Sequence, residues 1–515
     1  MVDVRPVVDV VPPELGVIAP RRASALVALG LLLGCSSPPP AAPDAGLDAA
    51  VAADLGLPPG PEVPPPEPLP AVEGVGPFDD LSPDPRVLEV NLTAAPGSLS
   101  LRGTTETEVL AYNGAIPGPM LHARVGDRVI VHFHNGLDQP TTVHWHGLRI
   151  SDQMDGSPRV QDPVPPGGDF TYDFRLPEAG TFWYHAHVNT IEQIARGLYG
   201  VFVVHEARPP AFDRERIIAL DDVRLTPSGA ISPFLHSGPD VGRGRLGNVL
   251  LINGRADPWR VEVPRHATER WRIVNTSNAR TFVLAFDDGS PLRVIGTDGG
   301  LLPVPYETPQ LTVAVGQRYE LDMRLDDPER SSRTLQALVQ VLVREGVVET
   351  RPFPLVEAAV VGEVPARPAY VPPEVYLPSL EPSAPESLTW NLSGGLVDAG
   401  VEFTINGVAG HHADGGHGHA LERVDQGRPV LITLRSMVSP EHPFHLHGQF
   451  FQIVAPGGRA QEEPGLKDTV LVQGIQPVTI LTYFENPGRW MYHCHISEHA
   501  ERGMMGEVEV VLRTR

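Results

Sequence analysis

The sequence predicts an all-β protein built from three β-sandwich domains in tandem, and three observations support this prediction. The chain has 515 residues, too many for one hydrophobic core. Gly (51) and Pro (56) make about a fifth of these residues, which favours many turns and short strands over long helices. Asn-Gly followed by a run of strand-like residues occurs three times, which indicates a repeated β domain.

Residues 1–35 predict an export signal. Arg21 and Arg22 precede an apolar run of about twelve residues, too short to span a bilayer, and Leu-Leu-Gly-Cys then ends at Cys35. The pattern resembles a bacterial lipoprotein signal, in which Cys35 becomes the lipidated first residue. The alternative is an ordinary secretory signal with an incidental cysteine, and the paired arginines are compatible with twin-arginine export. We expect an exported protein, lipid-anchored in the bacterial cell envelope on the periplasmic side or in the outer membrane.

Residues 36–85 contain fifteen prolines, nine acidic residues and no basic residue. Such a segment cannot bury apolar area, and its prolines hold it extended. We predict a Pro-rich acidic linker that acts as a stalk. The net charge of the whole chain is -23, which argues against nucleic acid and anionic membrane surfaces as partners.

The repeated pattern sets the domain boundaries. Its copies begin at Asn113 and Asn253, and a degraded third copy begins at Asn406. The starts are 140 and 153 residues apart, the size of one β-sandwich each. Seven prolines between residues 365 and 385 mark the last boundary. The predicted domains are residues 86–207, 208–364 and 365–515.

The histidines form a metal-binding pattern. The chain has twenty histidines and six H-x-H pairs, where chance would give about one. Residues i and i+2 of a strand point to one face, so each pair aims two imidazoles at one place. Eight imidazoles exceed the needs of one metal, and imidazole suits copper, zinc, iron or nickel. Four pairs lie in strand-like, aromatic-rich contexts: His144/His146, His185/His187, His445/His447 and His493/His495.

Cys494 lies between two of these histidines, so its sulfur points to the opposite face of the strand and needs other partners. His442, His499 and Met504 remain available. Two histidines, one cysteine and a weak axial methionine make a blue-copper site. One strand would then carry a mononuclear copper on one face and a metal cluster on the other.

These residues resemble the three-domain multicopper oxidases, the laccase-like group, over residues 86–515. The motifs H-x-H-G, H-x-H, H-x-x-H-x-H and H-C-H-x-x-x-H-x-x-x-x-M are all intact. The resemblance implies three cupredoxin-like Greek-key β-sandwiches and four coppers per chain: one type 1, one type 2 and two type 3. The middle domain would be a spacer without copper ligands. The implied ligands are His442, Cys494, His499 and Met504 for type 1, His144 and His445 for type 2, and His146, His185, His187, His447, His493 and His495 for the type 3 pair.

The resemblance also implies an oxidase that takes single electrons from a small reducing substrate through type 1 copper and reduces O2 to water. That reaction consumes four protons, so an acid is needed near the cluster. Asp155 stands where family members carry such an acid, and we expect it to be catalytic; the alternative is that it only caps the turn before Gly156. A second family acid is replaced by Ala500, which leaves Glu498 or Glu501 as possible substitutes.

Three functions remain open. We expect a monomeric, laccase-like oxidase of phenolic or aromatic donors. The alternatives are an oxidase of Cu(I) or another metal ion that serves copper tolerance, and a non-catalytic copper-binding envelope protein. The chain has no methionine-rich cluster, but residues 411–419 hold four histidines that are either an extra copper-binding loop or a solvated insertion. His132 and His134 are interpreted as ordinary strand residues.

Overall fold

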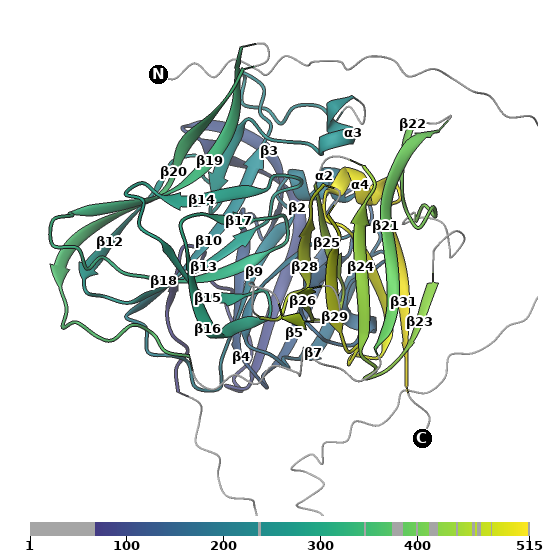
Figure 1. Ribbon diagram of the computed structural model, residues 1–515, viewed down its shortest axis with the longest axis horizontal. Coiled ribbons are helices and arrows are strands. Elements are labelled where there is room, and N and C mark those ends of the chain that lie inside the picture. The colour runs from purple at the N-terminus through teal and green to yellow at the C-terminus, as the bar shows by residue number, and fades with distance from the viewer. Residues whose placement is uncertain are drawn as a thin grey trace, which may run out of the picture. The chain divides into compact units, whose positions relative to one another are not determined.

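The computed structural model describes residues 67–234, 238–344, 347–372, 385–397, 400–410, 421–438, 441–455, 459–460, 465–474 and 476–512. The predicted signal with Cys35, most of the linker and the 411–419 loop lie outside these residues. Strands dominate the fold, in three successive β-sandwiches (Figure 1). The described helices are short: η1 (Asp152–Met154), α2 (Thr190–Ala195), α3 (Pro239–Arg243) and α4 (Ser497–Glu501). None of these helices has the length and apolarity needed to cross a membrane.

The first sandwich packs two four-stranded sheets. One sheet has the order β3 (Thr105–Tyr112), β2 (Val87–Arg102), β5 (Arg128–Asn135) and β7 (Asp169–Arg175). The other has the order β4 (Gly118–Arg124), β9 (Tyr199–His205), β8 (Gly180–Ala186) and β6 (Val143–His146). Burial alternates along β2 and β5, as expected for strands with one face on the core, and β5 lies in the strand-like run that follows Asn113.

The middle sandwich has a seven-stranded and a five-stranded sheet. The first is β1 (Val72–Glu73), β10 (Arg214–Val223), β13 (Glu269–Asn275), β18 (Arg318–Met323), β15 (Leu292–Thr297) and β16 (Gly300–Thr308), with β11 (Val249–Ile252) also paired to β10. The second is β12 (Trp259–Arg265), β20 (Val347–Glu363), β19 (Ser332–Arg344), β14 (Phe282–Phe286) and β17 (Leu311–Val313).

The third sandwich has a six-stranded and a five-stranded sheet. The first is β22 (Gly400–Ile405), β21 (Glu386–Val397), β24 (Val430–Ser436), β29 (Val478–Thr482), β26 (Phe451–Ala455) and β27 (Arg459–Ala460). The second is β23 (Leu421–Asp425), β31 (Met505–Val511), β30 (Gly488–Cys494), β25 (His442–Leu446) and β28 (Thr469–Val472).

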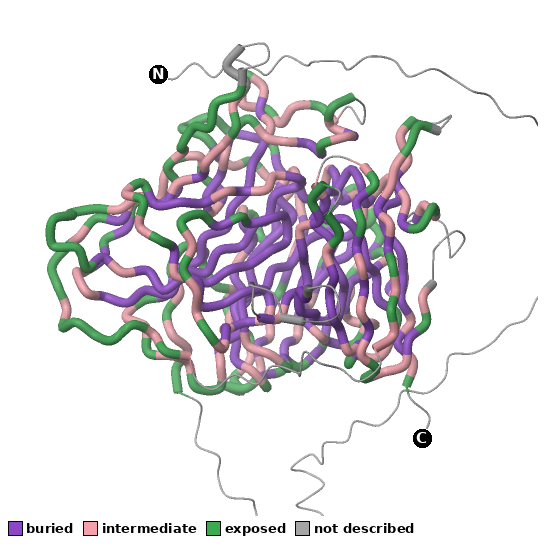
Figure 2. The backbone as a smooth tube through the Cα atoms, in the orientation of Figure 1, coloured by how far each residue is buried: buried purple, intermediate pink, exposed green. Residues whose placement is uncertain are grey.

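Each sandwich encloses its own apolar core. Trp145 lies in the first core, Trp271 in the second, and Trp390 and Trp490 in the third, all with no exposed surface. Figure 2 shows this buried interior running along the strands, with exposed residues gathered in the connections. Three separate cores match the prediction that the chain is too long for one.

The three predicted copies of the repeat share one geometry. Asn113, Asn253 and Asn406 all adopt a left-handed backbone, with φ of 49°, 47° and 52°. A short polar side chain tolerates this conformation better than most residues do. Each asparagine side chain also makes two hydrogen bonds to the backbone of a neighbouring strand. It accepts from the N–H of one residue and donates to the carbonyl of the residue two positions before that one. The N–H and carbonyl partners are Thr93 and Asn91 for Asn113, Ala219 and Ile217 for Asn253, and Asn391 and Thr389 for Asn406.

The predicted stalk is shorter than residues 36–85. Val72–Glu73 forms β1, which pairs in parallel with β10, and Val75 is buried. Pro77 bridges to Met120 of β4. The stalk prediction is therefore wrong for the last part of this segment. The reason is tertiary: the edge of β10 offers unpaired backbone groups, and a short strand can satisfy them despite the surrounding prolines.

Candidate metal centres

Two β-ladders bring the four histidine pairs together. In the first sandwich, β6 and β8 run antiparallel, with His144 opposite His185. In the third, β25 and β30 run antiparallel, with His445 opposite His493. The second members of three pairs, His187, His447 and His495, each follow directly after one of these strands. All eight side chains are buried.

The eight histidines form three groups whose ring nitrogens lie within 4.8 Å of one another. The groups are His144, His146 and His445; His146, His185 and His495; and His187, His447 and His493. Each group takes residues from the first and third sandwiches. The cluster thus lies between these two sandwiches, as the sequence resemblance implies.

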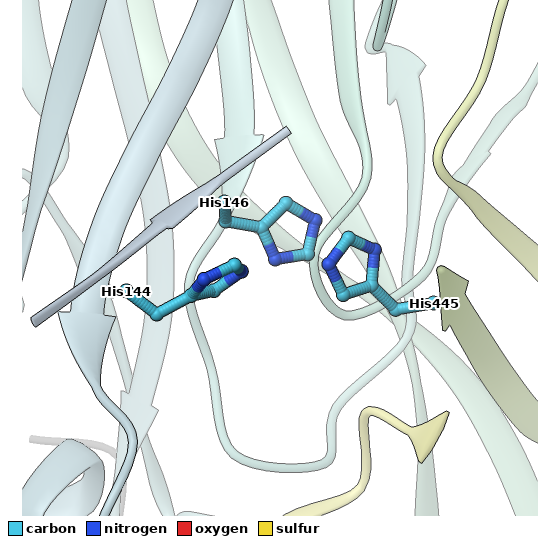
Figure 3. Close-up of side chains that lie close together, drawn as sticks. All are labelled: His144, His146 and His445. Carbon is cyan, nitrogen blue, oxygen red and sulfur yellow. The ribbon is translucent and has the colours of Figure 1, made fainter. Parts of the chain in front are cut away.

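Ring stacking ties the two sandwiches at this point. His146 stacks on His445 with ring centroids 3.7 Å apart, and His144 stacks on His447 at 3.9 Å. Figure 3 shows His144 and His146 reaching from one side and His445 from the other, with their rings turned toward one another. This packing places imidazoles from residues about 300 apart in sequence against one another.

The chemistry of this cluster fits bound metal. The Nε2 atoms of His144, His185 and His445 are buried and have no hydrogen-bond partner in the structure, which is costly for a polar atom. Burial lowers the pKa of His146, His185 and His495 well below the usual value, so these rings are neutral at physiological pH. Neutral imidazole is the form that binds metal. Metal ions would satisfy the bare nitrogens.

A separate site lies on the opposite face of β30. Cys494 Sγ is 3.5 Å from His499 Nδ1 and 3.7 Å from His442 Nδ1, and the two Nδ1 atoms are 3.2 Å apart. Met504 is buried, and its carbonyl accepts a hydrogen bond from the Cys494 N–H. Burial raises the pKa of the Cys494 thiol, so a bound cation is needed to produce the thiolate here. The set fits a soft metal such as copper.

The comparisons with known proteins agree with this geometry. The sequence matches multicopper oxidases over residues 93–209, 236–331 and 399–513. It is 30% identical to multicopper oxidase MmcO of Mycobacterium tuberculosis, over 93% of this chain and 94% of that protein. This chain belongs to the multicopper oxidase family. The family implies four copper ions per chain, with one type 1, one type 2 and two type 3 sites.

Two solved structures are also similar to this multicopper oxidase. One is a metallo-oxidase of the same family from Campylobacter jejuni, with a TM-score of 0.73 and 26% identity over 87% of this chain and 96% of that one. The other is a laccase-like multicopper oxidase from the lignin-degrading bacterium Ochrobactrum sp., with a TM-score of 0.72 and 25% identity over 86% and 100%. The relatives therefore include both kinds of oxidase.

Asp155 contacts the cluster of this multicopper oxidase directly. Its Oδ2 lies 2.9 Å from His447 Nδ1, and its carbonyl oxygen lies 2.8 Å from His144 Nδ1. It also ends the η1 turn, and Gly156 follows with a φ of 79°. The two interpretations of Asp155 are therefore compatible: the turn aims the carboxylate at the cluster.

Glu498 and Glu501, the two glutamates near Ala500, are not part of the histidine cluster. Glu501 accepts hydrogen bonds from the backbone N–H and the hydroxyl of Thr190, so it joins α4 to α2. Glu498 is buried, and burial raises its pKa to about 7. Among the described residues, neither carboxylate belongs to a histidine group that could hold metal.

Sequence reasoning missed Asp468. Its Oδ1 lies 3.0 Å from His146 Nε2 and 3.4 Å from His445 Nδ1, and its carbonyl accepts from His445 Nδ1 at 2.9 Å. Burial alone would raise the pKa of Asp468, but the charge of Arg318 and the contact with His146 hold it well below its usual range. No local motif marks this aspartate, because its partner His146 lies 322 residues away.

Arg318, on β18 of the middle sandwich, contacts a residue of the cluster's surroundings, Asp468. Its guanidinium donates to both carboxylate oxygens of Asp468, at 2.7 and 2.6 Å, and its Nε donates to the Thr181 carbonyl on β8. One side chain thus contacts all three sandwiches. Gly316, two residues before Arg318, packs so closely that a Cβ there would lie 3.0 Å from the His146 ring. The middle sandwich holds no histidine pair, but it supports the cluster.

We predict that Arg318→Lys weakens copper binding at the cluster. Lysine keeps the charge but loses the planar fork that holds both oxygens of Asp468. Loss of a residue that orients metal ligands typically lowers metal affinity about 10- to 100-fold. Copper per chain and the electron paramagnetic resonance signal of type 2 copper measure the effect. Arg324→Lys is the control, because Arg324 pairs with the half-exposed Asp326. Full copper and an unchanged signal would show that Arg318 serves packing alone.

A cavity of about 1220 Å³ lies between the middle and third sandwiches beside the Cys494 site. Residues from β14, β17 and β19 form one wall. Val438 and Glu441, which precede His442 in the chain, contribute to the other wall, as does Ile496, which follows His495. A small molecule in this cavity would lie next to the residues that fit type 1 copper.

Proposed function

We propose that this multicopper oxidase is laccase-like and couples the one-electron oxidation of small phenolic or aromatic donors to the four-electron reduction of O2 to water. The observation that carries the proposal is the cavity beside His442. Its lining includes the apolar side chains of Leu246, Val283, Leu338 and Ile496, which suit an aromatic ring. Family membership supports the use of O2 and a reducing substrate.

The same cavity supports a metal-ion donor less well. A Cu(I) site needs soft sulfur or several imidazole ligands. Met437 supplies the one sulfur among the described lining residues, and Glu441 the one carboxylate. The metal-oxidase alternative has its own support in the Campylobacter jejuni relative, which is described as a metallo-oxidase. The 411–419 loop that motivated it lies outside the described residues.

We assign the following roles to the chain's own residues. Bound copper would supply the one-electron chemistry, with His442, Cys494, His499 and Met504 holding type 1 copper and the eight paired histidines holding the other three. Burial of both sites excludes bulk water from them. The covalent path from Cys494 through its neighbours His493 and His495 joins the two sites. Asp155 holds a carboxylate at His447 where a proton can be exchanged.

Oxygen consumption with two donors side by side tests the proposal. We expect the copper-loaded protein to consume O2 steadily with 2,6-dimethoxyphenol and much more slowly with Cu(I). A higher kcat/KM for Cu(I) than for the phenol would replace this proposal with the metal-oxidase alternative. Absence of O2 consumption with both donors, at four coppers per chain, would favour the non-catalytic copper-binding protein.

We also propose that Cys35 anchors the protein to the cell envelope, since Leu-Leu-Gly-Cys follows an apolar run. Cys35→Ala should move the protein from the membrane fraction to the soluble fraction, because one lipid group is then lost. Fractionation followed by immunoblotting measures this. Membrane association that survives the substitution would contradict the lipoprotein interpretation.

A further inference from the structure

The charge of the cavity is opposite to that of the chain. The chain has 63 acidic and 40 basic residues, yet the charged residues lining the cavity are Arg243, Arg280, Arg435 and Glu441. A cleft with charges of mainly one sign focuses the electric field and concentrates ligands of the opposite sign. The donor cavity is therefore a cationic pocket in an acidic protein.

Two of the three arginines are available to a ligand. Arg243, at the end of α3, and Arg435, on β24, are exposed, and neither makes an ion pair with any residue that the structure describes. Arg280 is already bound, because its Nε lies 2.6 Å from Asp222 Oδ2 and its Nη2 donates to the Gly247 carbonyl. The pocket thus offers two guanidinium groups with unused donors.

Glu441, the one carboxylate among the described lining residues, is partly occupied. Glu441 Oε2 accepts a hydrogen bond from Gln473 Nε2 at 2.7 Å. A single hydrogen-bonded carboxylate is a poor site for a cationic donor, which would also meet Arg243 and Arg435, unpaired within the described part of the chain. Guanidinium groups instead match the planar oxygens of carboxylates and the oxygens of sulfonates, which they bind with paired hydrogen bonds.

We propose that this cavity selects aromatic donors that carry a carboxylate or sulfonate group. The ring lies on the apolar wall close to Ile496, and the anionic group binds Arg243 and Arg435. This inference rests on the proposed function, because it assumes that electrons enter from an aromatic molecule in this cavity. It adds the substrate class: anionic aromatic compounds over neutral and cationic ones.

A matched pair of donors tests the inference: 4-hydroxy-3,5-dimethoxybenzoate and its methyl ester, which differ in charge but keep the phenol. In the double variant Arg243→Gln/Arg435→Gln we expect KM for the carboxylate to rise about 4- to 25-fold, since one exposed charge contact changes affinity about 2- to 5-fold. KM for the ester should change by less than about two-fold. Added salt should raise KM for the carboxylate in the wild type and much less in the variant.

Arg260→Gln is the control, because Arg260 lies on β12, is paired with Glu357 on the surface, and is not among the cavity residues. Blue absorbance and copper content confirm that each variant is folded and loaded. An unchanged KM for the carboxylate, with ester turnover intact, would overturn the inference and leave the proposed function standing. An equal rise for both donors would also overturn it, since charge would not be the cause. Failure of the loaded wild type to oxidise either compound, while it oxidises Cu(I), would instead refute the proposed function.

Discussion

Cys494→Ser should abolish the intense blue absorption of the protein and reduce oxidase activity with aromatic donors to background. Serine cannot supply the soft thiolate that lies between His442 and His499, at 3.7 and 3.5 Å from their Nδ1 atoms. The path through the backbone to His493 and His495 also begins at this sulfur. Absorption spectra and O2 consumption measure the two effects.

The cluster should survive this substitution. His493 and His495 point away from Cys494, and the ring stacking between the first and third sandwiches involves other histidines. Copper analysis should therefore fall from four ions per chain to about three. Cys35→Ser is the matched control, since it removes the other cysteine of the chain and should leave the blue colour intact. Retained blue colour in Cys494→Ser would refute the assignment, and a wild-type count of one or two coppers would refute the cluster.

Asp155→Asn should slow the reduction of O2 by about 10²- to 10⁴-fold, the usual contribution of general acid–base catalysis. Asparagine keeps the size and can still accept a hydrogen bond from His447, but it cannot bind and release a proton. Electron transfer from the donor should continue, because Cys494 lies on the other face of β30. Under turnover the blue colour should then bleach and return slowly in air, which stopped-flow absorbance can follow.

Asp152→Asn provides the control for this prediction. Asp152 lies three residues earlier, in η1, and its carboxylate accepts from the Arg489 backbone N–H rather than from a histidine. A wild-type rate across pH in Asp155→Asn would make Asp155 a turn residue only. Asp468 is the other carboxylate within 3.5 Å of a cluster histidine among the described residues, but it would be a poor replacement, because Arg318 and His146 hold its pKa well below the usual range. Loss of cluster copper would show that Asp155 orients its histidines.

The grouping of the four histidine pairs could be predicted from the sequence because each pair is a local pattern. A strand points residues i and i+2 to one face, so each H-x-H pair carries its geometry within three residues. The same alternation turns Cys494 away from His493 and His495, and the structure places its sulfur beside His442 and His499 instead. The repeats at Asn113, Asn253 and Asn406 are also local, because a left-handed Asn-Gly turn is encoded by two adjacent residues.

Glu498 and Glu501 show the limit of reasoning from neighbours in sequence. Both lie within the ligand motif of residues 493–504, yet Glu501 binds Thr190 on another sandwich, and neither belongs to a histidine group that could hold metal among the described residues. Asp468, which contacts the cluster together with Asp155, follows no motif. The short strand β1 could likewise not be predicted, because the segment around it is Pro-rich like the rest of the stalk. It becomes a strand only by pairing with the edge of β10.

The sequence by itself predicted the β-sandwich repeats, the four histidine pairs and the two faces of the His493–His495 strand, and the structure has all three. All of these depend on residues a few positions apart, whose relative directions the backbone sets. The tertiary structure alone decided that Arg318 holds Asp468 against His146, and that Arg243 and Arg435 line the cavity beside His442. These contacts join residues far apart in the chain. Their geometry depends on how whole sandwiches pack, and side-chain periodicity carries no information about that packing.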